Sequence, residues 1–65
     1  MTREEVFELF LEDLEQPAIQ MALYRSFRRY ADLRDQLIAS YTKHTGIPEE
    51  EFHSQIALKL VDSLG

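Results

Sequence analysis

The sequence predicts an all-α fold, a compact bundle of three or four short helices forming a single domain over residues 1–65. Three observations support this prediction. Apolar residues recur every three or four positions along most of the chain, as on one face of a helix. The two prolines and two glycines lie where helices are expected to begin or end. No segment alternates apolar and polar residues as a half-buried strand does.

The first helix is expected over residues 3–15. Thr2 precedes it and Glu5 stands three residues later, a spacing typical of a capping box. Pro17 disfavours helical geometry in the residue before it and so ends this helix. The apolar residues of the segment fall within one arc of the helix surface: Val6, Phe7, Phe10, Leu11 and Leu14.

The middle of the chain carries one apolar stripe but allows two interpretations. Asp32 can cap a new helix, which gives helices over residues 17–30 and 32–45. Alternatively, one long helix runs through Asp32, because the stripe continues across it with little change of phase. We favour a break near Asp32, since a single long helix would overhang its shorter neighbours in a bundle.

The last helix is expected over residues 48–64. Gly46 can end the preceding helix in a left-handed conformation, and Pro48 suits a first turn. The three glutamates at 49–51 complement the positive end of the helix dipole. Apolar residues then repeat at four-residue intervals: Phe52, Ile56, Leu60 and Leu64.

The apolar stripes together predict the hydrophobic core. Its expected members are Phe7, Phe10, Leu14, Leu23, Phe27, Tyr30, Leu37, Tyr41, Phe52, Ile56 and Leu60. A chain this short buries only about 60% of the surface that its unfolded form exposes, so its stability is marginal. We therefore expect self-association, with a homodimer as the simplest form.

Charge is divided unevenly along the chain, whose net charge is −5. Residues 1–15 and 46–65 are acidic, and residues 16–45 are basic. The overall acidity opposes nonspecific binding to nucleic acid and to anionic membranes. The sequence also has no apolar run approaching the ~20 residues that span a bilayer. We therefore expect a cytoplasmic protein that does not associate with membranes.

The acidic first helix needs a compensating positive charge. Its glutamates at positions 4, 8 and 12 repel one another because residues four apart are neighbours on a helix. We expect the second helix to fold back and bring Arg25, Arg28 and Arg29 toward these glutamates. A basic partner protein is the alternative source of compensation.

Chemistry at an active site or metal centre is not indicated. There is no cysteine and no glycine-rich loop, and His44 and His53 are too few to form a zinc site. Both histidines fall on or near the apolar stripes, so we expect them to be partly buried packing residues. The sequence therefore predicts no cofactor and no enzymatic activity.

Three large apolar residues lie off the main stripes and indicate a second surface. Leu9 and Leu58 lie on the first and last helices, and Met21 lies beside Arg25 and Arg28. Methionine and arginine are enriched at protein interfaces. We therefore predict a small protein–protein interaction module, such as a regulator, adaptor, inhibitor or accessory subunit, with these five residues as contacts. The alternative is a nucleic-acid-associated regulator that uses the Arg25, Arg28 and Arg29 cluster, which the acidic balance disfavours.

Overall fold

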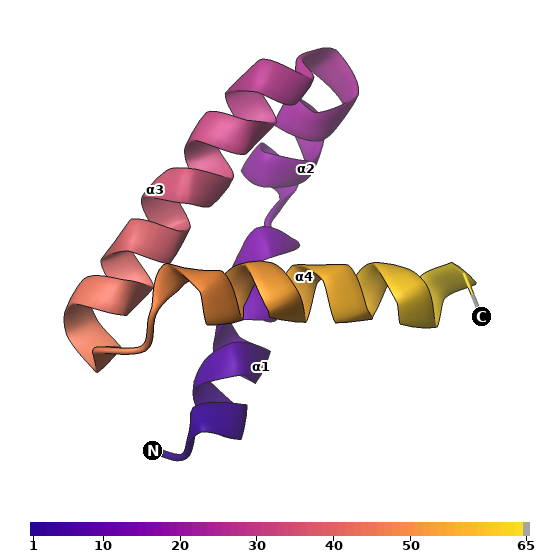
Figure 1. The fold of residues 1–65 in the computed structure, drawn as a ribbon. Helices are drawn as coiled ribbons and strands as arrows, with labels where there is room; N and C mark the ends of the chain where they lie inside the picture. The colour runs from indigo at the N-terminus through magenta and orange to yellow at the C-terminus, as the bar shows by residue number, and fades with distance from the viewer. Residues whose placement is uncertain (65) are drawn as a thin grey trace.

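The structure, a computed structural model, describes residues 1–64 as four α-helices without a strand (Figure 1). The helices are α1 (Arg3–Leu14), α2 (Pro17–Arg25), α3 (Phe27–Thr45) and α4 (Glu49–Leu64). α2 and α3 lie side by side as an antiparallel hairpin, and α4 crosses α1 (Figure 1). The prediction of a small all-α bundle is confirmed.

The start of α1 is capped as the Thr2–Glu5 spacing predicts. Thr2 Oγ1 accepts a hydrogen bond from the Glu5 backbone N–H at 3.2 Å, and the hydroxyl donates to the Glu5 carboxylate at 3.2 Å. The chain leaves the helix at Leu14 and re-enters helical geometry at Pro17. Gln16 has an extended ψ of 141°, as expected for a residue that precedes proline.

The break in the middle of the chain lies at Ser26, so the prediction of a break near Asp32 is wrong. Ser26 is extended, with φ −157° and ψ 111°, and its Oγ accepts from the Arg29 backbone N–H at 3.4 Å. Serine is a strong N-cap residue because its hydroxyl satisfies a free amide of the first turn. A break here folds α2 back along α3 and buries Ala22 between them, whereas α3 continues without interruption through Asp32.

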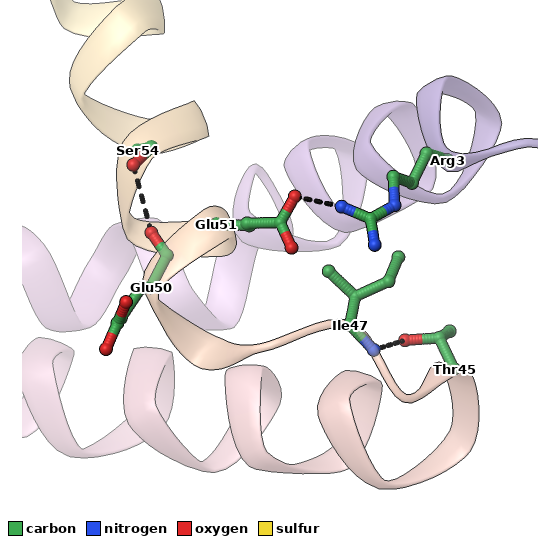
Figure 2. Close-up of polar contacts among 6 residues, drawn as sticks. All are labelled: Arg3, Thr45, Ile47, Glu50, Glu51 and Ser54. Atoms are coloured by element: carbon green, nitrogen blue, oxygen red, sulfur yellow. Dashed lines mark hydrogen bonds and ion pairs between the residues drawn. The ribbon is translucent and has the colours of Figure 1, made fainter.

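The connection from α3 to α4 spans residues 46–48, and polar contacts lie around it (Figure 2). Gly46 ends α3 with φ 76°, and its N–H donates to the Thr42 carbonyl at 2.9 Å. Ile47 is buried, and its backbone N–H donates to the Thr45 hydroxyl at 3.2 Å. An ion pair between Arg3 and Glu51 joins the first turns of α1 and α4.

The core forms where α1 meets the C-terminal half of α3 and the N-terminal half of α4. Its buried members are Val6, Phe10, Leu14, Ile19, Ala22, Ile38, Ile47 and Phe52. The rings of Phe10 and Phe52 lie 4.9 Å apart between centroids, and Tyr41 packs against both at 5.5 and 5.7 Å. Of the predicted core, Phe10, Leu14 and Phe52 are buried, and Phe7, Tyr30, Leu37, Tyr41 and Ile56 are partly buried against it.

Three predicted core residues, Leu23, Phe27 and Leu60, are exposed instead. A four-residue repeat advances about 40° around a helix at each step, so the α4 stripe turns away from the core. Exposure accordingly rises from 0% at Phe52 to 61% at Leu60 and 89% at Leu64. Phe27 occupies the first position of α3, at the turn of the hairpin, and is 66% exposed there. Leu23, on α2, is 40% exposed.

Candidate interaction surface

An open apolar groove lies between the α2–α3 hairpin and the C-terminal half of α4. Its volume is about 210 Å³. Six of its lining residues are apolar or aromatic, namely Leu11, Leu14, Leu23, Tyr30, Ile56 and Leu60. Such concave apolar surfaces are the usual sites at which proteins accept a partner or a ligand.

Polar contacts fix the rim of this groove. Lys59 forms an ion pair with Glu15, which ties α4 to the end of α1. Gln20 donates from Nε2 to the Leu14 carbonyl at 3.0 Å, so that a free acceptor at the end of α1 is satisfied. These two contacts link the end of α1 to α2 and to α4 around the groove.

A second apolar surface, the α4 face, adjoins the groove. We define it as Ala57, Leu60, Val61 and Leu64, whose spacing of three, one and three residues places them along one side of a helix. All four side chains are exposed. This half of α4 projects beyond the other helices (Figure 1). Leu60 belongs to both surfaces, so the groove and the α4 face are continuous.

The molecule exposes more surface than its size requires. Its accessible surface is 4947 Å². Monomeric proteins of 7.7 kDa expose about 4,300 Å². The radius of gyration is 11.8 Å, compared with about 10.7 Å for a typical domain of this length. The excess, roughly 600 Å² per chain, reflects helices that project without a covering neighbour.

The basic tip is a third exposed feature, at the turn of the hairpin. We define it as Met21, Tyr24, Arg25, Phe27, Arg28 and Arg29. All six residues are exposed. The rings of Phe27 and Tyr30 lie 5.9 Å apart, which packs one side of Phe27 against α3. None of the three arginines forms an ion pair with any residue in the range 1–64.

The structure places the five predicted contact residues in separate positions. Met21, Arg25 and Arg28 share the basic tip. Leu9 and Leu58 are exposed on α1 and α4, but neither lines the groove. The α4 face was missed because the helical projection assigned Leu60 to the core. The signal for it was present in the sequence, since Leu60, Val61 and Leu64 follow Ala57 at helical spacing.

The expected compensation of α1 by the arginines is wrong. α2 leads away from α1 and folds against α3 (Figure 1), and among the described residues none of the three arginines forms an ion pair with the glutamates at 4, 8 and 12. Other groups instead interact with the carboxylates at the C-terminal end of α1. Lys59 pairs with Glu15, Gln16 Nε2 donates to Asp13 at 3.3 Å, and the Tyr41 hydroxyl donates to Asp13.

The hydrogen bond from Tyr41 to Asp13 joins α3 to α1 across the core. Burial raises the pKa of Tyr41 to about 12, and the hydrogen bond and negative charge of Asp13 act in the same direction, followed by the charge of Glu12. The tyrosine hydroxyl is therefore held in its neutral, donating form.

Both histidines are exposed, so the prediction that they are partly buried packing residues is wrong. His44 Nδ1 lies 2.8 Å from the Ser40 carbonyl, within its own helix. In the part of the chain that the structure describes, His, Asp and Glu side chains do not gather into groups of three or more suited to a metal ion. Within the same range, no helix combines the length and apolar character needed to cross a bilayer.

The chain matches no protein-family model, no curated protein and no solved structure. Functional proposals for it therefore rest on the groove, the α4 face and the basic tip.

Proposed function

We propose that the protein is a non-enzymatic protein–protein interaction module that forms a homodimer through its α4 face. A module of this kind serves as a regulator, adaptor, inhibitor or accessory subunit. The absence of cysteine from the sequence fits a reducing compartment, and we propose the cytoplasm.

The observation that carries the proposal is the clustering of exposed apolar residues. Single exposed leucines are ordinary on soluble proteins. Here the described residues include ten exposed large apolar side chains, and four of them lie in segment 58–64 of α4, where Leu60, Val61 and Leu64 share the α4 face. Contiguous apolar patches of this kind mark interaction sites.

The excess accessible surface of the whole chain is of the size that a small dimer interface covers. The roughly 600 Å² excess, to which the basic tip contributes as well as the α4 face, amounts to about 1,200 Å² over two chains. Specific stable interfaces begin at about this size, and smaller contacts are weak or transient. We therefore expect a weak to moderate homodimer, which dissociates on dilution.

A two-fold arrangement suits the residues of the α4 face. If two α4 helices pack antiparallel about an axis between Leu60 and Val61, Leu60 faces the second copy's Val61. In the same arrangement, Ala57 faces the second copy's Leu64, so a small side chain meets a large one. Such a contact uses the same patch on both chains and closes on itself, as in most homodimers.

Sedimentation equilibrium of matched variants tests this proposal. Val61→Glu introduces a charge on the α4 face, and Leu58→Glu introduces one at a similarly exposed position off that face; the wild-type side chains are 64% and 57% exposed. We expect the wild type and Leu58→Glu to dimerise and Val61→Glu to remain monomeric, with unchanged helical circular dichroism in all three. A monomeric wild type at high concentration, or equal loss of the dimer in both variants, would contradict the proposal.

A further inference from the structure

We propose that the basic tip is a separate docking site for an acidic, apolar-containing segment of a partner protein. This inference goes beyond the proposed homodimer, because the tip lies on the α2–α3 hairpin and the dimer uses α4. It also names the chemistry of the partner as glutamate or aspartate residues interspersed with apolar side chains.

The basic tip carries positive charge that no ion pair within the described residues balances. Arg25, Arg28 and Arg29 lie within five residues of one another in a chain of net charge −5. Three of the other basic residues are paired, since Arg3 contacts Glu51, Arg34 contacts Asp35, and Lys59 contacts Glu15. The tip arginines have no such partner among the described residues. Their charge is therefore available to an acidic group from outside.

The position of the arginines within α3 strengthens this argument. Arg28 and Arg29 lie in the first turn of α3, and that turn contains no acidic residue. The N-terminal end of a helix carries partial positive charge, so cations there are unfavourable and anions are favoured. The other long helices differ, because α1 and α4 both begin with glutamates in their first turns. A carboxylate bound at the tip would supply the charge that α3 lacks.

The basic tip also exposes apolar and aromatic side chains. Tyr24 and Phe27 are 85% and 66% exposed, and Met21 lies one helical turn before Arg25. Aromatic residues, methionine and arginine are the residue types enriched in the energetically important parts of protein interfaces. An acidic segment that also carries apolar side chains would therefore contact both components of the tip.

A protein segment fits the tip better than nucleic acid does. Three arginines neutralise few phosphates, so the counterion-release contribution to affinity is small. A long polyanion would also meet the repulsion of an acidic chain, which has six acidic residues and one basic residue in positions 1–15. A short acidic segment engages the tip alone and avoids that repulsion.

Fluorescence anisotropy with defined probes tests the site. The probe is a labelled twelve-residue peptide that alternates glutamate with leucine and phenylalanine, compared with the same peptide carrying lysine for glutamate and with a twelve-nucleotide single-stranded oligothymidine. We expect wild-type protein to bind the glutamate peptide in preference to the other two. Arg28→Glu should weaken that binding by about tenfold or more. Lys43→Glu, which makes the same charge change at the other end of α3, should leave the affinity within about twofold.

Several results would overturn the inference. Equal or tighter binding of oligothymidine would assign the tip to nucleic acid. Equal losses of peptide affinity in Arg28→Glu and Lys43→Glu would show that the peptide responds to the net charge of the protein and not to a site at the tip. Absence of binding to the glutamate peptide would also exclude the site. Sedimentation of Arg28→Glu separates this inference from the proposed dimer. An unchanged dimer with lost peptide binding supports a distinct site, whereas loss of the dimer would show that the tip contacts a second copy instead.

Discussion

The two ends of the molecule use the same kinds of residue with opposite results. At the packed end, α1, the C-terminal half of α3 and the N-terminal half of α4 enclose Phe10, Ile38 and Phe52 almost completely. The open end comprises two separate parts, the hairpin turn and the C-terminal half of α4 (Figure 1), where Phe27 and Leu64 lie largely in water.

Sequence spacing explains only part of this difference, because the four-residue repeat that joins Phe52 to Leu64 drifts by about 40° around the helix at each step. The rest of the difference arises from how many helices surround each position. Three helices meet at the packed end, whereas helices at the open end project past their neighbours (Figure 1). In a protein this small, a side chain can be on the correct helical face and still have nothing to pack against. The exposed apolar residues of the open end are therefore available for binding.

Truncation at the two ends of α4 gives the largest expected contrast. Phe52→Ala should destabilise the protein by about 3–5 kcal/mol, because it leaves a cavity in the core. Leu60→Ala should cost about 1 kcal/mol or less, because this side chain is already mostly in water. Urea unfolding at two protein concentrations measures both effects and identifies any contribution from dimerisation.

The whole domain is stable by only about 3–10 kcal/mol, so at the lower end of that range Phe52→Ala leaves too little folded protein to measure. Phe52→Leu then tests the same position with a smaller change, and we expect it to lower the free energy of unfolding by about 1–1.5 kcal/mol. Equal costs at positions 52 and 60 would mean that the open end belongs to the core, and the comparison between the ends would fail.

Alkaline pH should weaken the packed end through Tyr41. The pKa of Tyr41 is raised from 10.0 to about 12 in the folded protein, so its contribution to stability is complete below pH 10. As pH rises through 12, the tyrosine ionises in the fold as well and this contribution is lost. Thermal unfolding of Tyr41→Phe should show lower stability than the wild type by about 1–2 kcal/mol at pH 8, and the difference should shrink by pH 11.5.

Tyr24 provides the matched control for this experiment at the open end. It is exposed, and its hydroxyl forms no hydrogen bond with the residues that the structure describes. Tyr24→Phe should therefore follow the wild-type pH profile. If the wild type and Tyr41→Phe changed in parallel between pH 8 and 11.5, the hydrogen bond from Tyr41 to Asp13 would not contribute to stability.

The smallest expected effect concerns the turn that forms the open end. Ser26→Ala removes the N-cap of α3 and should cost about 1 kcal/mol, whereas Asp32→Ala should change stability by less than about 0.5 kcal/mol. Chemical denaturation of the two single variants measures this difference. A larger cost at Asp32 than at Ser26 would place the break where the sequence pattern suggested, and would remove the hairpin from which the open end is built.

The residues of the candidate surfaces were only partly predictable. Helical spacing grouped Met21, Arg25 and Arg28 on one helix face, but the break at Ser26 places Arg28 on α3 and the other two residues on α2. They remain near one another because they flank the same turn of the chain. The α4 face was not predicted from the sequence, because Leu60 continues the stripe that begins at the buried Phe52. A four-residue repeat departs from the helical period by about 40° at each step, and how much of that drift is tolerated depends on the neighbouring helices.

The sequence by itself determined the helical class of this protein, the capping of α1, the termination of α3 at Gly46 and the aromatic centre of the core. These features depend on residues close together in the chain, where caps, glycine conformation and apolar periodicity act locally. The tertiary structure alone decided between Ser26 and Asp32 as the break, and it decided which part of α4 is covered. Both residues can cap a helix, so the choice depends on packing between α2 and α3. That packing directs the basic tip away from α1 and leaves the open end exposed.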